Sequence, residues 1–122
     1  MSKMQIVLSV WIYASICEET FVRGLLQGYL STLGLQKVFR VGKWLLSVPV
    51  LLGAFFFGAM HVVLWPKMGP FALVPMSLAT MLGVVTGYYR EKSGSLLPAI
   101  VIHALFNIGG SLPLWILSAL VN

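Results

Sequence analysis

WLLSVPVLLGAFFFGAMHVVLW, residues 44–65, is a stretch of 22 residues without a formally charged side chain. Lys43 precedes it, and Pro66 and Lys67 follow it. A helix needs about 20 predominantly apolar residues to cross the hydrocarbon core of a bilayer. The stretch therefore predicts a transmembrane helix.

The composition of the whole chain agrees with a membrane location. Apolar residues make up 59% of the 122 residues and charged residues 9%, whereas a soluble domain carries about 25% charged residues. The net charge of +5 is spread between the apolar runs, which is typical of loops that anchor helices rather than of a nucleic-acid surface. We expect an integral membrane protein with one domain, residues 1–122, whose partner is the lipid bilayer and not nucleic acid.

Four apolar runs predict an all-α bundle of about four transmembrane helices. The runs lie near residues 4–34, 44–65, 70–90 and 96–120. At 1.5 Å per residue the first is longer than a ~30 Å core, so it must tilt, kink or project. Two pairs of glycines four residues apart, Gly24 with Gly28 and Gly83 with Gly87, permit close approach of helices.

Basic residues in the loops favour one orientation. The first loop carries Lys37, Arg40 and Lys43, and the third carries Arg90 and Lys92. The second loop and the N-terminus carry one lysine each. Because cytoplasmic loops carry the excess of Lys and Arg, we expect the first and third loops in the cytoplasm. The short loops favour a prokaryotic plasma membrane.

Polar clusters interrupt the apolar runs in three places. Their sequences are EETFVR at 18–23, FGAMH at 57–61 and HALFN at 103–107. An ionisable side chain at membrane depth costs roughly 2.5–3.5 kcal/mol on insertion scales, which makes it a candidate functional residue. Almost all the chemistry available to this chain lies in these clusters.

Helical spacing distinguishes the two adjacent acids. Glu19 and Arg23 are four residues apart and share a helix face, whereas Glu18 lies about 100° away around the helix. Glu19 therefore has a local ion partner and Glu18 has none. This makes Glu18 the candidate general base; neutralisation of Arg23 by both acids is the structural alternative.

The two histidine clusters show the same spacing of four residues. Phe57 and His61 form one pair, and His103 and Asn107 form the other. The amide of Asn107 can donate a hydrogen bond without carrying charge, which an oxyanion-stabilising group requires. A hydrogen bond between helices is the alternative role for Asn107.

Depth in the membrane is a difficulty for a shared site. Counted from Trp44 and Trp65 at 1.5 Å per residue, His61 lies about 6 Å from the outer interface. His103, counted from Leu96, lies about 10 Å from the inner one. In a flat arrangement the two histidines are some 14 Å apart, so the helices must tilt or stagger to bring them together.

The order EExxxR, FxxxH, HxxxN, one motif per predicted helix, resembles the CPBP family. This family comprises the CAAX proteases and bacteriocin-processing enzymes, also called Abi-type intramembrane proteases. Every motif position matches, and residues 93–100, SGSLLPAI, resemble the segment that usually precedes the last motif. The resemblance covers about residues 14–110 and implies that the four helices correspond to the family's catalytic core.

The resemblance implies an intramembrane endopeptidase that hydrolyses a peptide bond of a membrane-associated peptide or protein, of CAAX or bacteriocin type. Glu18 and His61 then activate the water, and His103 and Asn107 stabilise the oxyanion. Glu19 and Arg23 hold the site together. Phe57 is the candidate substrate-binding residue.

Two alternative functions and one cofactor question stay open. Chains of Glu and His inside membranes also relay protons or serve transport, and the same fold could serve as a non-catalytic immunity or scaffold protein.

We favour a site without metal. The alternative is Zn²⁺ or another divalent ion held by Glu18, His61 and His103, a ligand set found at catalytic zinc sites.

Overall fold

The structure, a computed structural model, describes residues 3–35 and 38–121 and is mostly helical. The helical run from 3 to 32 contains α1 (Lys3–Ile6), η1 (Val7–Ala14), α2 (Ser15–Glu19), η2 (Thr20–Leu26) and α3 (Gln27–Thr32), of which η1 and η2 are π-helical. A hairpin of β1 (Val38–Val41) and β2 (Trp44–Ser47) follows. The remaining elements are α4 (Val48–Met60), η3 (His61–Leu64), α5 (Trp65–Met68), η4 (Gly69–Ala72), α6 (Leu73–Ser93) and α7 (Leu97–Val121).

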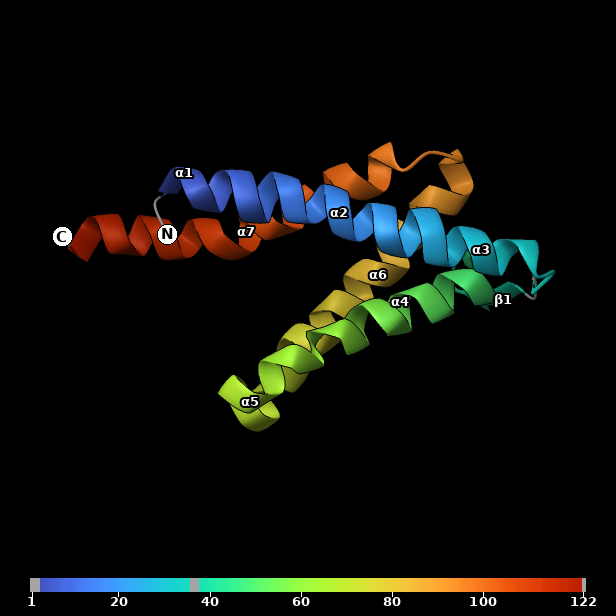
Figure 1. Cartoon of the computed structure of the whole chain (residues 1–122), viewed down its shortest axis with the longest axis horizontal. Helices are drawn as coiled ribbons and strands as arrows, with labels where there is room; N and C mark the ends of the chain where they lie inside the picture. Colours follow the sequence, from blue (N-terminus) through green and yellow to red (C-terminus); the bar gives the residue numbers. More distant parts are fainter. Residues whose placement is uncertain (1–2, 36–37, 122) are drawn as a thin grey trace.

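The helices form two crossing pairs. The run from α1 to α3 lies beside α7, and α4 and α6 run together at an angle to that pair (Figure 1). The buried core lies where the pairs meet. Its residues are Val22, Phe57, Ala79 and Leu82, with Leu26 and Ile102 packed against them. The first helical run, α4, α6 and α7 therefore all contribute side chains to one core.

The second predicted helix begins four residues later than expected. We predicted a helix from residue 44, but Trp44–Ser47 is a β-strand and α4 starts at Val48. Ser47 caps the helix with its side chain, which accepts a hydrogen bond from Val50 N at 3.4 Å. Pro49 occupies the first turn, where its missing N–H costs little. Capping and proline thus set the boundary that hydropathy alone placed too early.

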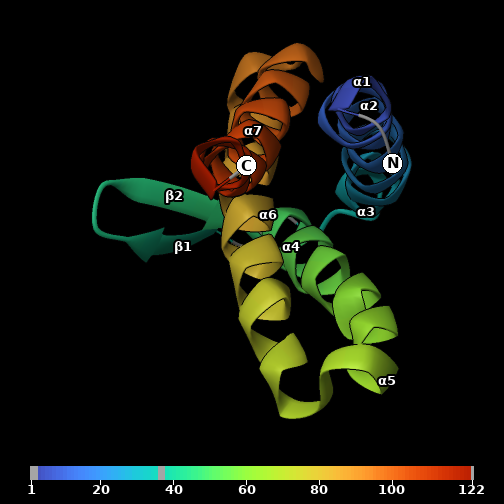
Figure 2. The ribbon, with the colours of Figure 1, turned by 90° about the vertical axis from the view of Figure 1, so that its left-hand side faces the viewer.

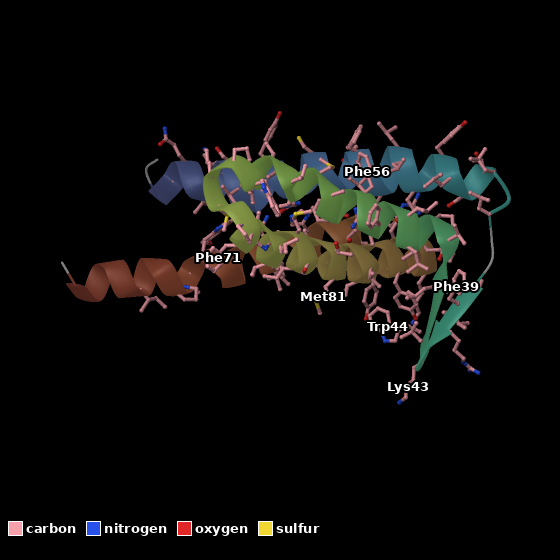
Figure 3. The ribbon with its side chains drawn as sticks, turned by 90° about the horizontal axis from the view of Figure 1, so that it is seen from below. Phe39, Lys43, Trp44, Phe56, Phe71 and Met81 are labelled. Atoms are coloured by element: carbon pink, nitrogen blue, oxygen red, sulfur yellow. The ribbon has the colours of Figure 1, made fainter. Side chains whose placement is uncertain are left out.

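The β-hairpin was not predicted and departs from an all-α architecture. β1 and β2 pair antiparallel, with Val41 opposite Trp44, which leaves a two-residue loop. Gly42 begins this loop with φ +61°, the conformation that a glycine supplies in tight hairpin turns. Figure 3 shows Lys43 at the tip of the hairpin, away from the helices.

The long apolar run from Val48 to Ser93 doubles back on itself. Two 3₁₀ turns and α5 reverse the chain within residues 61–72, so α4 and α6 lie side by side and join at α5 (Figure 2). Among the described helices, this run is the one long and apolar enough to cross a membrane, with a mean hydropathy of 2.0. Leu97–Pro113 is a shorter apolar helix. The predicted helical membrane class agrees with these features.

The predicted glycine pair on α6 lies at the contact with α4. A Cβ atom added at Gly83 would lie 2.8 Å from the Cα of Ala54 and 2.9 Å from Nη2 of Arg23. At Gly87 it would meet Oε1 of Gln27 at 3.1 Å. The absence of these side chains therefore allows α6 to approach both α4 and the polar residues of the first helical run.

Candidate active site

A buried ion pair between Glu19 and Arg23 anchors the site. Oε2 of Glu19 lies 3.3 Å from Nε of Arg23, and both side chains are fully buried. The same Nε donates a hydrogen bond to Oγ1 of Thr86 on α6 at 3.1 Å. The expected pair is present, and Thr86 ties it to a second helix.

His103 lies between the two acids. Its Nδ1 is 2.9 Å from Oε1 of Glu19, and because a carboxylate oxygen accepts hydrogen bonds, Nδ1 donates the proton. The opposite nitrogen, Nε2, lies 3.8 Å from Oε2 of Glu18. Glu19 therefore orients the ring as a carboxylate orients a catalytic histidine, and directs Nε2 toward Glu18.

His61 faces a cavity that it shares with Glu18. Its Nδ1 lies 3.0 Å from the backbone oxygen of Phe57. A carbonyl oxygen accepts, so Nδ1 is the donor of this hydrogen bond. Glu18 and His61 line a cavity of about 210 Å³, which is large enough for water. The imidazole of His61 and the carboxylate of Glu18 therefore line the same cavity.

Phe57 holds the two histidines in place. Its ring makes edge-on contacts with His61 and His103, both at 5.4 Å between ring centroids. The guanidinium carbon of Arg23 lies 4.8 Å from the same ring centroid. The two histidines are therefore neighbours despite their different predicted depths. Phe57 itself is only 1% exposed, so these contacts position the site, and contact with substrate stays a prediction.

Asn107 lies at the far wall of the site and also joins two helices. It lines a cavity of about 130 Å³ together with His61 and His103. Its Nδ2 donates to the backbone oxygen of Val10 at 3.1 Å and to Oγ of Ser15 at 3.2 Å. Both amide hydrogens are therefore engaged, and an oxyanion would have to replace one of these acceptors.

Three polar residues of this region were missed by the sequence analysis. Thr86 accepts from Arg23, Ser15 accepts from Asn107, and Gln27 donates to the backbone oxygen of Gly87 at 3.1 Å. Thr86 was detectable as a polar residue beside the predicted Gly83–Gly87 contact. Ser15 and Gln27 carry no comparable local signal.

The metal question stays a prediction. Within residues 3–35 and 38–121, no group of three or more His, Cys, Asp or Glu side chains is placed to hold a metal ion. Of the three candidate ligands, His103 directs Nδ1 to Glu19, and its Nε2 lies 3.8 Å from Glu18.

The comparisons with known proteins identify the family. A family model described as type II CAAX prenyl endopeptidase Rce1-like matches residues 2–109. The chain belongs to this family. No curated protein and no solved structure matched the chain.

Membership of the Rce1-like family has direct consequences for this chain. The family is one of membrane-associated proteases, so the chain is a protease-family membrane protein. The match includes all three polar clusters, from Glu18 to Asn107. The predicted CPBP resemblance is confirmed at the level of the family.

Proposed function

We propose that this chain is an intramembrane endopeptidase in which Glu18 and His61 activate water for attack on a peptide bond. The observation that carries the proposal is that both side chains line one cavity of about 210 Å³. Nδ1 of His61 is directed to Phe57 O, so Nε2 is the ring nitrogen that we propose acts on water. Glu18, with its side chain 35% exposed, is accessible, whereas its neighbour Glu19 is fully buried.

In the proposed reaction a water molecule loses a proton to the Glu18–His61 pair as its oxygen attacks the scissile carbonyl carbon. The carbonyl oxygen becomes an oxyanion. His103, which Glu19 holds in place, stabilises this oxyanion, and Asn107 donates a hydrogen bond to it once its amide leaves a first-helix acceptor. The proton held by the Glu18–His61 pair passes to the amine as the C–N bond breaks.

The apolar face of α6 supports a lipid-modified substrate. The 130 Å³ cavity shares Leu78, Leu82 and Phe106 with an adjoining apolar cavity of about 460 Å³. That cavity in turn shares Met81 and Val85 with a third, of about 490 Å³, which reaches the hairpin at Trp44. Met81 and Trp44 lie on the same side of the molecule (Figure 3). We propose that this groove receives the prenyl chain of a CAAX-type substrate.

The proposed topology has four membrane passes within one domain. They are the run from 3 to 32, α4 with the turns after it, α6, and α7. Both basic loops then face the cytoplasm. In a variant whose Cys17 is replaced by Ser, a cysteine at position 43 should be labelled from the cytoplasmic side and one at position 67 from the outside. The reverse pattern would invert the proposed topology.

The central experiment measures cleavage of a fluorogenic prenylated CAAX peptide by the purified protein in liposomes. Glu18→Gln should abolish cleavage while leaving the melting temperature almost unchanged, since the side chain is partly exposed and lacks a cation partner. Glu91→Gln, which neutralises an exposed acid outside the site, is the matched control and should cleave normally. Full activity of Glu18→Gln would disprove its role as base.

The same liposomes distinguish the competing functions. A proton relay should acidify the lumen under an imposed potential and lose this flux in Glu18→Gln, with no peptide cleavage. A scaffold protein should show neither activity. Cleavage without proton flux is the result that we expect.

Substrate recognition is tested by blocking the groove. Val85→Trp should raise the KM for the prenylated peptide and leave cleavage of the unprenylated peptide unchanged, because Val85 lies between the second and third cavities. Leu52→Trp, at an exposed position of α4 outside the groove, is the control. Equal effects of both variants would argue against the groove as the prenyl site.

A further inference from the structure

A separate polar cavity, of about 300 Å³, shares Arg23 and Gln27 with the region of the candidate active site. It lies between the first helical run and the end of α6. Its lining residues are Arg23, Gln27, Gly28, Ser31, Arg90 and Glu91. Neither the proteolytic mechanism nor the apolar groove uses this cavity.

Two nitrogens of Arg23 have no hydrogen-bond acceptor in the described part of the chain. Its Nε is engaged by Glu19 and Thr86, but Nη1 and Nη2 are buried, and no residue within 3–35 and 38–121 accepts a hydrogen bond from them. The ring of Phe57 covers one face of the guanidinium, and a ring face does not replace in-plane acceptors. A guanidinium offers its outer N–H groups as a planar fork that matches the oxygens of phosphate or carboxylate.

A second arginine at the cavity also has an unpaired nitrogen. Nε of Arg90 is buried and has no hydrogen-bond partner among the described residues. The one acid in the lining, Glu91, accepts a hydrogen bond from Oγ of Ser47 at 2.8 Å. Glu19 is shared between Arg23 and His103. The cavity therefore has two arginines against one carboxylate, and its unused donors favour an anion.

Aromatic residues indicate the membrane depth of this end of α6. The ring of Trp44 lies 4.6 Å from that of Tyr88 and 6.3 Å from that of Tyr89, and Nζ of Lys92 lies 5.6 Å from the centroid of the Tyr88 ring. Trp and Tyr are enriched at the level of the lipid headgroups. Arg90 follows Tyr89 directly, so the cavity is near headgroup depth.

We propose that this cavity binds the phosphate of an anionic phospholipid headgroup. Basic pockets between transmembrane helices are typical sites for anionic headgroups. The phosphate oxygens would accept from the side chains of Arg23 and Arg90, both of which line the cavity. Through Arg23, the bound lipid would also brace the Glu19–Arg23 pair, and so stabilise the helix junction beside the active site.

The test is a thermal melt of the purified protein in detergent micelles doped with phosphatidylglycerol or with zwitterionic phosphatidylcholine. A ligand that binds only the folded state raises the melting temperature with its concentration. Phosphatidylglycerol should raise it in a saturable way, and phosphatidylcholine should not. An equal shift with both lipids would overturn the proposal. So would an equal shift with inorganic phosphate, which would assign the site to the free ion.

Three variants localise the binding. Arg90→Gln should raise the half-saturating lipid fraction at least tenfold. Arg40→Gln on the exposed hairpin removes the same charge outside the cavity and should raise it by no more than about fivefold, the contribution of one basic residue near an anionic surface. Glu91→Gln removes the competing anion, keeps an acceptor for Ser47 and should lower the half-saturating fraction.

Equal weakening by the two arginine variants would overturn the proposal, because it would show general surface attraction. If Arg90→Gln does not fold, the Glu91→Gln variant tests the proposal by itself. Lipid binding by Glu91→Gln that is equal to or weaker than wild type would then overturn the proposal. The thermal melt does not depend on peptide cleavage. The absence of a lipid effect would therefore not contradict the proposed proteolysis.

Discussion

Glu18 and Glu19 are neighbours in sequence and differ completely in environment. Glu19 is fully buried and divides its two oxygens between Arg23 and His103. Glu18 is partly exposed, lines the small cavity with His61 and lies within 3.8 Å of His103. Glu19 is therefore suited to orienting Arg23 and His103, and Glu18 is suited to reacting with water.

Removing the charge of Glu19 should be costly for stability. Glu19→Gln leaves the buried guanidinium of Arg23 without its counter-charge, and breaking one partner of a buried pair costs about 3–5 kcal/mol. Unfolding in mixed detergent–SDS micelles, followed by circular dichroism, measures the loss. Glu18→Gln is the internal control, because Glu18 has no such partner. Coincident unfolding curves for the two variants would mean that the buried pair does not stabilise the fold.

Asn107 is expected to affect both stability and turnover. Asn107→Ala removes the hydrogen bonds to Val10 and Ser15, each worth on the order of 0.6 kcal/mol between membrane helices. If the amide also serves the oxyanion, kcat should fall about 10²–10³-fold with little change in KM. Ser15→Ala removes one of these bonds outside the cavities and should lower only the melting temperature. Wild-type kcat in both variants would reduce Asn107 to a bridge between helices.

At the scale of elements, the packing of α6 on α4 decides where Arg23 can lie. Gly83 faces both the backbone of Ala54 and the guanidinium of Arg23. Thr86, three residues later on α6, receives the hydrogen bond from Arg23. One helix face therefore provides both the close approach and the polar contact that locate the buried charge.

Gly83→Ala should push α6 away from α4 and lower the stability of the protein. The added methyl group would lie 2.8 Å from Cα of Ala54, and overpacking of this kind costs typically about 1–3 kcal/mol. Gly110→Ala on α7 is the matched control, since the added Cβ would meet no atom of the described residues within 4 Å beyond its own stretch of helix, and it should be neutral or slightly stabilising. A melting temperature for Gly83→Ala equal to that of the control would show that α4 and α6 need no close approach here.

At the scale of the whole molecule, the crossing of the two helix pairs assembles the site. Residues of the first run, α4, α6 and α7 meet around Phe57, whose neighbours include Arg23, His61 and His103. The angle between the pairs (Figure 1) offsets the difference in depth that a flat bundle would impose on the two histidines.

Chelation tests the proposed water activation by the whole assembled site. Because Glu18, His61 and His103 are not gathered around one point, we expect a chelator titration to leave the cleavage rate unchanged. Metal analysis of the purified protein should find no stoichiometric divalent ion. Loss of cleavage that Zn²⁺ restores would instead show that a metal draws these three side chains together.

The sequence by itself determined the membrane class, the three polar clusters and the partners within two of them, Glu19 with Arg23 and Phe57 with His61. These features depend on hydropathy and on helical spacing, so residues within about four positions of one another carry the signal. The pairing of Glu19 with Arg23 is of this kind. The same local signals failed at residues 44–47, where the cap at Ser47 and the turn at Gly42 favour a hairpin over an earlier helix start.

Only the tertiary structure decided which clusters meet and on which atoms. The contact of His103 with Glu19 joins residues 84 positions apart, and that of Arg23 with Thr86 joins residues 63 positions apart. Such pairs depend on the crossing of the helices and on the close approach at Gly83, which no local pattern specifies. The cavity shared by Glu18 and His61, and the unused donors of Arg23 and Arg90, exist for the same reason.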